Sequence, residues 1–342
     1  MIFPKILIQW YLANKRELPF RETKDPYFVW LSEIMLQQTR VAQGLPYYLA
    51  FTEAFPTVSD LGNATENDVL KLWQGLGYYS RARNLHFTAK YVSEELNGSF
   101  PNSYAELLKL KGIGQYTAAA IASFCFDEPV PVVDGNVFRV IARYFGVDTD
   151  ISSSGAKAEF TAIAAAQMPA HNAAVFNQAI MEFGALQCTP KSPHCESCPL
   201  NQTCFAFRNH KVGMLPVKNK KTKVRERFFN YLVFSDELDQ TILRQRKGKG
   251  IWENLYEFPL VETDTEADAE TIANLISSEN AIVSIEEINR KPIVHKLSHQ
   301  HLKIKFRKIK VEGIVQNGIK AEQLRDYPMP AVLFNFVAEH WK

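Results

Sequence analysis

The chain of 342 residues lacks any long hydrophobic run and any excess of one sign of charge. No apolar run reaches the roughly 18 residues that a membrane-spanning helix needs, which excludes an integral membrane protein. Residues 1–16 lack the apolar core and small-residue cleavage site of a secretion signal, so they predict an amphipathic helix of a cytosolic protein. The 39 basic and 37 acidic residues leave a net charge of +2, too small to indicate a nucleic-acid partner.

Hydrophobic residues make up 46% and charged residues 22% of the chain, a mixture that excludes a disordered or fibrous protein. At roughly 150 residues per domain, the length predicts about two domains. The sequence contains no internal repeat and no long low-complexity tract. Composition therefore leaves the function open, and the motifs must decide it.

Cysteine is scarce, with five residues in all, yet four of them fall in one short segment with the spacing C-x6-C-x2-C-x5-C. Because Cys125 is left over, a disulfide framework is a poor explanation in a reducing compartment. Zinc often takes two CxxC pairs, whereas the single pair and wider arms here favour a [4Fe–4S] cluster, with zinc as the alternative. The four predicted ligands are Cys188, Cys195, Cys198 and Cys204.

The spacing of apolar residues differs between the two halves of the chain. Up to about residue 210, apolar residues recur at helical spacing between turn signals, which predicts an almost entirely α-helical part. Six basic residues then fall within residues 218–227. Beyond them, alternation with a period of two predicts strands, and residues 266–279 and 329–342 predict helices. We therefore expect a mainly α N-terminal part and a smaller α+β domain.

A Gly-x-Gly turn, Gly112-Ile-Gly114, opens onto the next predicted helix. Such a turn presents backbone N–H groups beside the positive end of the helix dipole, which suits an anion such as a DNA phosphate. Glycine is required because a Cβ would hinder a positive φ and hold the phosphate away. The alternative is a tight turn between helices that binds nothing.

Two carboxylates are candidates for acid–base chemistry. Asp134 lies at the start of a predicted helix, where N-capping, worth about 1 kcal/mol, is its common role. Glu33 lies within a predicted helix on a partly apolar face that includes Trp30. An apolar pocket would disfavour its charged form and raise its pKa toward that of a general acid, whereas an exposed glutamate there would have no special role.

Five motifs occur in the order that is typical of one enzyme superfamily. They are residues 30–39 (WLSEIMLQQT), 75–85 (GLGYYSRARNL), 110–114 (LKGIG), 133–137 (VDGNV) and the four-cysteine segment. With them the chain resembles the helix-hairpin-helix DNA glycosylases, and within these the MutY-type adenine glycosylases, which remove adenine mispaired with 8-oxoguanine. The match covers residues 1 to about 215 closely and the second half more loosely.

The resemblance implies a domain plan and a fold. Residues 1–215 would form the catalytic region, a six-helix barrel with an iron–sulfur domain whose cluster loop spans residues 188–204. Residues 216–227 would form a basic linker, and residues 228–342 a Nudix-like domain that recognises 8-oxoguanine. The acidic stretch at 261–267 lacks the REx2EE spacing that gathers Mg²⁺, so we expect a recognition domain and not a pyrophosphatase.

The resemblance also implies roles for individual residues. Glu33 would protonate adenine at N7, and Asp134 would stabilise the oxocarbenium-like sugar, as paired carboxylates do in glycoside hydrolysis. Tyr116 and Asn136 would line the same site. The base must first leave the duplex stack. Positions that match the base pocket and the duplex wedge are Arg16, Phe20, Arg21, Gln38, Leu76, Tyr78 and Gln178, and the hairpin glycines Gly112 and Gly114 would bind DNA phosphate.

Three positions distinguish this chain within the resemblance. Relatives that also cut the DNA backbone carry a lysine where this chain has Tyr116, and without that amine no Schiff base forms there, which predicts a monofunctional glycosylase. Phe20 replaces the more usual Trp, and Gln178 stands where some members have Glu. For Leu76, ordinary packing between helices is the alternative to a wedge role.

The segment Leu297-Ser298-His299 is similar to the family's Phe-Ser-His loop, which senses 8-oxoguanine. Leu297 departs from Phe and removes an aromatic stacking surface. The alternative for His299 is a turn histidine bonded to backbone. The basic residues at 303, 305 and 307 would face either phosphates or solvent.

The implied partner is double-stranded DNA that contains A:8-oxoguanine or A:G mispairs. The implied protein is a monomeric hydrolase of base excision repair, cytoplasmic and nucleoid-associated as in bacteria, with no membrane partner. Three alternatives stay open: an endonuclease III-like glycosylase and lyase, a mispair-binding protein without catalysis, and a Nudix hydrolase of oxidised nucleotides. Tyr116 and the extra domain argue against the first, and the missing acidic box argues against the third.

Overall fold

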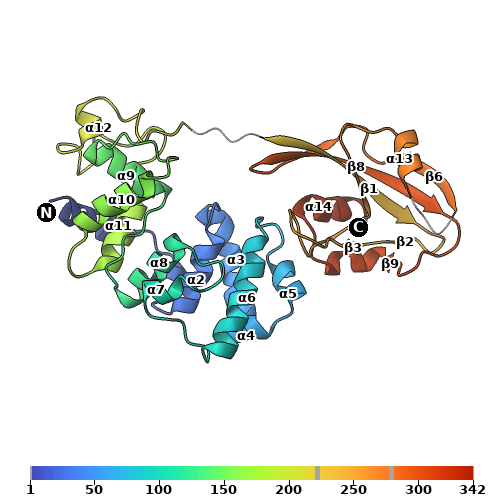
Figure 1. Ribbon diagram of the computed structural model, residues 1–342, viewed down its shortest axis with the longest axis horizontal. Coiled ribbons are helices and arrows are strands. Elements are labelled where there is room, and N and C mark those ends of the chain that lie inside the picture. Colours follow the sequence, from blue (N-terminus) through green and yellow to red (C-terminus); the bar gives the residue numbers. More distant parts are fainter. Residues whose placement is uncertain (1, 220–223, 277–280, 342) are drawn as a thin grey trace. The chain divides into compact units, whose positions relative to one another are not determined.

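The computed structural model describes residues 2–219, 224–276 and 281–341 (Figure 1). Its contacts divide the chain into two compact units: residues 1–63 with 84–220, and residues 64–83 with 221–342. Part of the predicted basic linker and the end of the predicted helix 266–279 lie outside the described residues. The domain bounds at 215 and 228 stay a prediction. None of the described helices is both long and apolar enough to cross a membrane.

The first unit is built from helices, as the sequence predicts, and contains no strand among its described residues. Its elements are α1 (Ile2–Asn14), η1 (Pro19–Arg21), α2 (Pro26–Met35), α3 (Val41–Ala54), α4 (Val58–Asn63), most of α6 (Ser80–Glu95), α7 (Tyr104–Leu107), α8 (Gln115–Phe126), α9 (Gly135–Phe145), α10 (Ala156–Gln167), α11 (Ala173–Leu186) and α12 (Phe205–Arg208). Helix α11 packs against α1, α8 and α9, and α2 packs against α8. These contacts bring the ends of four helices to one place.

Local sequence explains where the helices around the site begin. Asp25 caps α2, its carboxylate accepting a hydrogen bond from Tyr27 N at 2.8 Å, and Pro26 supplies the fixed φ of a first helical residue. Asp134 caps α9 in the same way. Buried apolar side chains of α1, α9 and α11, among them Leu7 and Phe183, form a common core. The core therefore fixes the capped start of α9 relative to its neighbours.

The second unit contains a five-stranded sheet in the order β5-β1-β8-β6, with β7 also paired to β8. The strands are β1 (Arg225–Ser235), β5 (Leu260–Thr263), β6 (Ile282–Glu287), β7 (Ile293–Lys296) and β8 (Gln300–Val311), and β1 and β8 run parallel. Smaller elements are α5 (Glu66–Leu72), β2 (Gln240–Thr241), β3 (Arg244–Gln245), β4 (Tyr256–Glu257), β9 (Ile319–Lys320) and η2 (Ala321–Asp326). The predicted α+β character of the C-terminal part is confirmed.

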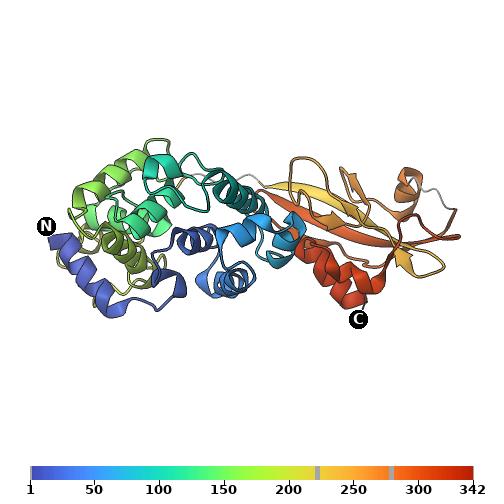
Figure 2. The ribbon, with the colours of Figure 1, turned by 90° about the horizontal axis from the view of Figure 1, so that it is seen from below.

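Helices α13 (Ala269–Leu275) and α14 (Ala331–His340) lie on opposite faces of this sheet (Figure 2). Phe336 of α14 stacks on Phe306 of β8, with ring centroids 3.7 Å apart. On the opposite face, Ile272 of α13 packs with Ile309 of β8. Because successive side chains of a strand point to opposite faces, β8 contributes apolar side chains to the packing against α14 on one face and against α13 on the other.

The sequence predicts that the basic residues of β8 face either phosphates or solvent, and the structure shows a different environment for them. Arg307 is fully buried and pairs with Glu287 at 2.8 Å, and Lys305 pairs with Glu266 at 3.0 Å. Lys303 pairs with Glu226 at 3.1 Å. These charges meet acidic partners of the same unit, so Lys305 and Arg307 face neither phosphate nor open solvent. Sequence patterns do not reveal this because the acidic partners come from other segments.

Candidate active site

Four predicted site residues line one cavity of the first unit. Glu33 comes from α2, Tyr116 from the first turn of α8, and Asp134 and Asn136 from the start of α9. The packing of α2 on α8 and of α8 and α9 on α11 brings these helix segments together. The predicted pocket residues Arg16, Phe20, Arg21 and Gln178 line the same cavity.

Glu33 has the environment that a general acid needs. Its residue is 9% exposed, and the Tyr116 hydroxyl donates a hydrogen bond to its Oε2 at 2.7 Å. Burial raises the pKa of Glu33 to about 7, with the nearby Asp134 charge acting in the same direction and the Tyr116 hydrogen bond and Arg21 acting against it. Near neutral pH this side chain therefore holds a proton that it can donate.

Asp134 is held by hydrogen bonds in one orientation. Its Oδ1 accepts from the backbone N–H groups of Asn136 and Val137, both at 2.8 Å, and its Oδ2 accepts from Asn136 Nδ2 at 2.8 Å. Burial raises the pKa of Asp134, while these hydrogen bonds favour the carboxylate. Asp134 is thus the N-cap of α9, and the same carboxylate also lines the cavity. The capping hydrogen bonds therefore hold the Asp134 carboxylate at the wall of the cavity.

The remaining pocket residues have defined partners. Phe20 is buried and packs edge-on against Tyr48, with ring centroids 5.5 Å apart. Gln178 Oε1 accepts a hydrogen bond from the Tyr11 hydroxyl at 2.7 Å. Glu182 also lines the cavity, although no motif of the sequence indicates it. Its signal was a single acidic residue within the apolar helix α11, one turn after Gln178.

The hairpin glycines differ in what surrounds them. Gly112 has φ +78°, and a Cβ there would lie 2.7 Å from Cβ of Asn84, so this position requires glycine. Gly114 immediately precedes α8, is exposed, and has open space where a Cβ would be. The backbone at the start of α8 is therefore open to approach, as a phosphate site requires.

The predicted wedge residues differ in exposure. Gln38 is exposed in the turn after α2, with a left-handed φ of 56°. Tyr78 also has a positive φ, 48°, and is 47% exposed, whereas Leu76 is buried. Within the second unit, the Tyr78 hydroxyl shares a hydrogen bond with Ser298 Oγ, and the adjoining His299 is exposed. A wedge candidate and the predicted lesion-sensing loop therefore meet, while the burial of Leu76 favours its packing alternative.

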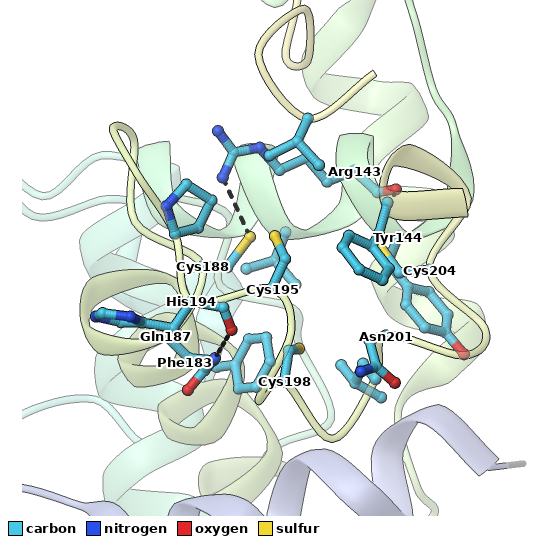
Figure 3. A pocket seen from close by; sticks show the side chains of 15 residues that line it. Arg143, Tyr144, Phe183, Gln187, Cys188, His194, Cys195, Cys198, Asn201 and Cys204 are labelled. Atoms are coloured by element: carbon cyan, nitrogen blue, oxygen red, sulfur yellow. Dashed lines mark hydrogen bonds between the residues drawn. The ribbon is translucent and has the colours of Figure 1, made fainter. Parts of the chain in front are cut away.

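The four clustered cysteines line a second cavity of the first unit (Figure 3). Arg143 of α9, itself buried, donates to Cys188 Sγ at 3.4 Å and to the Thr189 carbonyl at 2.8 Å. The cavity is otherwise lined largely by apolar side chains such as Val140 and Leu200. Four thiols around one enclosed space, beside a buried cation, fit a cluster held by four thiolates.

The Arg139 side chain connects the cavity of Glu33 and Asp134 to the cysteine loop by hydrogen bonds. Arg139 of α9 donates from Nη2 to Asn136 Oδ1 at 2.8 Å and from Nε to the Cys188 carbonyl at 2.7 Å. Asn136 in turn contacts Asp134. A continuous series of hydrogen bonds thus connects the Asp134 carboxylate, through Asn136 and Arg139, to Cys188.

Comparisons with known families agree with this arrangement. A model described as HhH-GPD superfamily base excision DNA repair protein matches residues 31–165. The iron–sulfur binding domain of endonuclease III matches residues 188–204, and a NUDIX domain matches residues 230–339. The predicted fold class and the [4Fe–4S] cluster are therefore confirmed, and the zinc alternative is dropped.

Two curated relatives that the chain resembles are adenine DNA glycosylases. The chain is 36% identical over 304 residues to the adenine DNA glycosylase of Buchnera aphidicola subsp. Schizaphis graminum, which covers 89% of this chain and 86% of that protein. It is 39% identical over 310 residues to the adenine DNA glycosylase of Arabidopsis thaliana, covering 79% of this chain and 49% of that protein.

Solved structures agree on the helical part. A thermostable thymine-DNA glycosylase superposes with a TM-score of 0.57 at 28% identity, covering 61% of this chain and 96% of that one. A non-covalent endonuclease III–DNA complex gives 0.53 at 23% identity, covering 61% and 95%. The second similarity concerns the fold alone.

Metal content gives a direct test of the cysteine loop. We expect about four iron atoms per chain and a broad visible absorption band, because each iron of the cluster takes one thiolate. Cys198→Ala should lower the iron content at least about twofold and reduce the yield of folded protein, since the loop loses a ligand. Cys125→Ala is the matched control, because Cys125 lies outside this cavity. Zinc in place of iron in elemental analysis would refute the assignment.

Proposed function

Because the chain belongs to the adenine DNA glycosylase family, we propose that it hydrolyses the bond between adenine and deoxyribose in A:8-oxoguanine and A:G mispairs. The observation that carries the proposal is the placement of Glu33 and Asp134 around one cavity, where burial raises the pKa of both, to about 7 for Glu33, while three hydrogen bonds to Asp134 oppose the effect of burial and favour its carboxylate form. Double-stranded DNA is the partner, and the enzyme is a monomer of the bacterial cytoplasm, associated with the nucleoid.

The chemistry assigns a separate task to each acid. Breaking the bond builds negative charge on the base and positive charge on the sugar. Glu33 donates its proton to adenine at N7, which lets the base leave as a neutral molecule. The Asp134 carboxylate faces the deoxyribose and stabilises its positive charge. Water then adds to the sugar carbon and gives up a proton, which restores the Glu33 carboxylic acid, so the products are free adenine and an abasic site.

The neighbouring residues support these tasks. The Tyr116 hydroxyl holds the Glu33 carboxyl, and Asn136 holds Asp134. Because Tyr116 occupies the position where lyases carry lysine, no Schiff base forms and the DNA backbone stays intact. Arg16, Phe20, Arg21 and Gln178 form the pocket for the flipped base. Cys188, Cys195, Cys198 and Cys204 would hold the [4Fe–4S] cluster, which would fix the loop that follows α11.

Contacts to DNA are spread over both units. Gly112 and Gly114 bind a phosphate through backbone N–H groups at the start of α8. Of the wedge candidates, the exposed Gln38 and Tyr78 contact the duplex beside the flipped adenine, whereas the buried Leu76 packs within the second unit. Ser298 and His299 contact the 8-oxoguanine. Tyr78 and Ser298 adjoin each other, which supports a shared role at the lesion.

The pKa of Glu33 predicts how the rate depends on pH. Since the proton is held with a pKa of about 7, the single-turnover rate constant of adenine release should fall as the pH rises through about 7. The measurement is single turnover at saturating enzyme across the range from slightly acidic to alkaline pH. A rate that stays constant or increases over this range would show that Glu33 is not the acid.

The function is tested by incubating the protein with matched duplexes, one with A:8-oxoguanine and one with an oxidised pyrimidine, each with and without borohydride. We expect adenine release from the first duplex and no trapped covalent adduct. Pyrimidine release with a trapped adduct would identify an endonuclease III-like enzyme instead. Tight binding of the A:8-oxoguanine duplex without release would identify a non-catalytic mispair-binding protein.

A further inference from the structure

Glu182 is a buried acid for which the proposed reaction has no use. It lies on α11 one turn after Gln178, and its side chain is fully buried. Removing a carboxylate from water costs several kcal/mol unless its partners restore the lost interactions. Because a buried ion pair seldom adds net stability, such a group calls for another explanation.

Both partners of Glu182 come from the segment between α1 and α2. Its Oε1 accepts from Arg16 N at 3.1 Å and from Arg16 Nε at 2.8 Å, and its Oε2 accepts from Arg16 Nη2 at 2.6 Å. Oε2 also accepts from Arg21 Nη2 at 2.7 Å. Burial raises the pKa of Glu182, but the hydrogen bonds from Arg16 and Arg21 outweigh it and lower the pKa to about 2. One carboxylate thus fixes two arginines of the pocket in its charged form.

One buried N–H donor group of the two arginines has no acceptor among the described residues. Nη1 of Arg21 is buried and has no hydrogen-bond partner within the part of the chain that the structure describes. Arg21 lines the same cavity as Glu33 and Asp134. A buried donor without a partner costs about 1–3 kcal/mol, and such groups in native proteins often serve a ligand. The free donor therefore points to an acceptor atom that binds in this cavity.

We infer that Glu182 is a positioning residue, which holds Arg16 and Arg21 so that Nη1 of Arg21 can bond an acceptor atom of the flipped purine. The inference rests on the proposed function. Glu182 contacts the two arginines and acts on the base through them. It therefore adds to the pocket a residue that sets the alignment of the base relative to Glu33 and Asp134.

The test is Glu182→Gln, which keeps the size of the side chain but removes the charge. We expect single-turnover adenine release to fall about 100-fold, the loss typical of a base misplaced by about 1 Å. The Kd for the duplex should change less than about threefold, because phosphate contacts do not involve Glu182. The matched control is Glu257→Gln, which breaks another buried glutamate–arginine pair, with Arg246, in the other unit. It should release adenine at the wild-type rate.

A double-mutant cycle separates positioning from a merely structural role. If Glu182 acts through Arg21, the double variant Glu182→Gln with Arg21→Gln should be no more than about threefold slower than Arg21→Gln alone. Additive losses, or a wild-type rate for Glu182→Gln, would overturn the inference. Should Glu182→Gln fail to fold, Glu182→Asp takes its place, with an expected loss of about 10-fold because the shorter side chain cannot reach both arginines. If neither folds, Glu182 is structural and the inference is wrong.

The wild-type protein in the same assay separates this inference from the proposed function. No adenine release by the wild type would refute the function and, with it, the inference. Release by the wild type together with an unchanged rate in Glu182→Gln would refute the inference alone.

Discussion

Glu33→Gln is expected to lower the rate constant of adenine release by about 10³-fold. Glutamine keeps the shape of the side chain and an oxygen that can accept the Tyr116 hydrogen bond, but it has no acidic proton to donate. Proton donation by a placed carboxylic acid typically contributes about 10²- to 10⁴-fold. Single-turnover excision from an A:8-oxoguanine duplex at saturating enzyme measures the loss, and a rate near that of the wild type would mean that another group supplies the proton.

Two further measurements make this variant informative. Because the folded protein holds the proton of Glu33 with a pKa above its ordinary value, its contribution to stability is present at low pH and is lost as the pH rises through about 7. Glu33→Gln should therefore become more stable than the wild type at alkaline pH, while its Kd for the duplex stays unchanged. Glu128→Gln is the matched control: Glu128 accepts a hydrogen bond from Tyr104 N outside the cavity, and its loss should leave the rate unchanged.

Asp134→Asn is expected to lower the excision rate constant by about 10²- to 10³-fold and to cost about 1 kcal/mol of stability. The amide removes the negative charge beside the sugar, and a single preorganised electrostatic contact of this kind is worth that much in rate. Asparagine still offers an oxygen to the N–H groups of Asn136 and Val137, and it is as good an N-cap as aspartate, but its amide NH₂ group cannot accept the hydrogen bond from Asn136 Nδ2. Single-turnover rates and thermal unfolding, measured on the same preparation, separate the two effects.

The control for Asp134→Asn is another capping aspartate. Asp25 caps α2, its Oδ1 accepting from Tyr27 N at 2.8 Å, and does not line the cavity. Asp25→Asn should keep its capping hydrogen bond from Tyr27 N and leave the rate intact. If both variants lose activity equally, the effect of Asp134 comes from capping and not from its charge.

Local sequence rules predict the parts of this fold that depend on neighbouring residues. Helical spacing, Asp-Pro starts and period-two alternation indicate the helical part, the capped helix at Asp134 and the strands of the second half. Cysteine spacing indicates the cluster because all its ligands lie in one short segment. Glu33 and Asp134 were candidates by position, but only the family resemblance brought them together in one site.

The parts that sequence did not predict depend on distant partners. Glu182 meets Arg16 and Arg21 across more than 160 residues, and no local pattern reveals such a pair. Arg307 is buried on the sheet because Glu287 of another strand compensates its charge. Residues 64–83 join the second unit through contacts with the C-terminal part of the chain, as in the pair Arg83–Glu253.

The placement of the two acids on one nucleoside is tested most directly by a crystal structure of the Glu33→Gln protein bound to an A:8-oxoguanine duplex. The variant should trap the intact substrate. We predict an extrahelical adenine with N7 within hydrogen-bond distance of residue 33 and with its deoxyribose against Asp134. An adenine that stays stacked in the duplex, or that occupies a pocket away from either side chain, would contradict the mechanism.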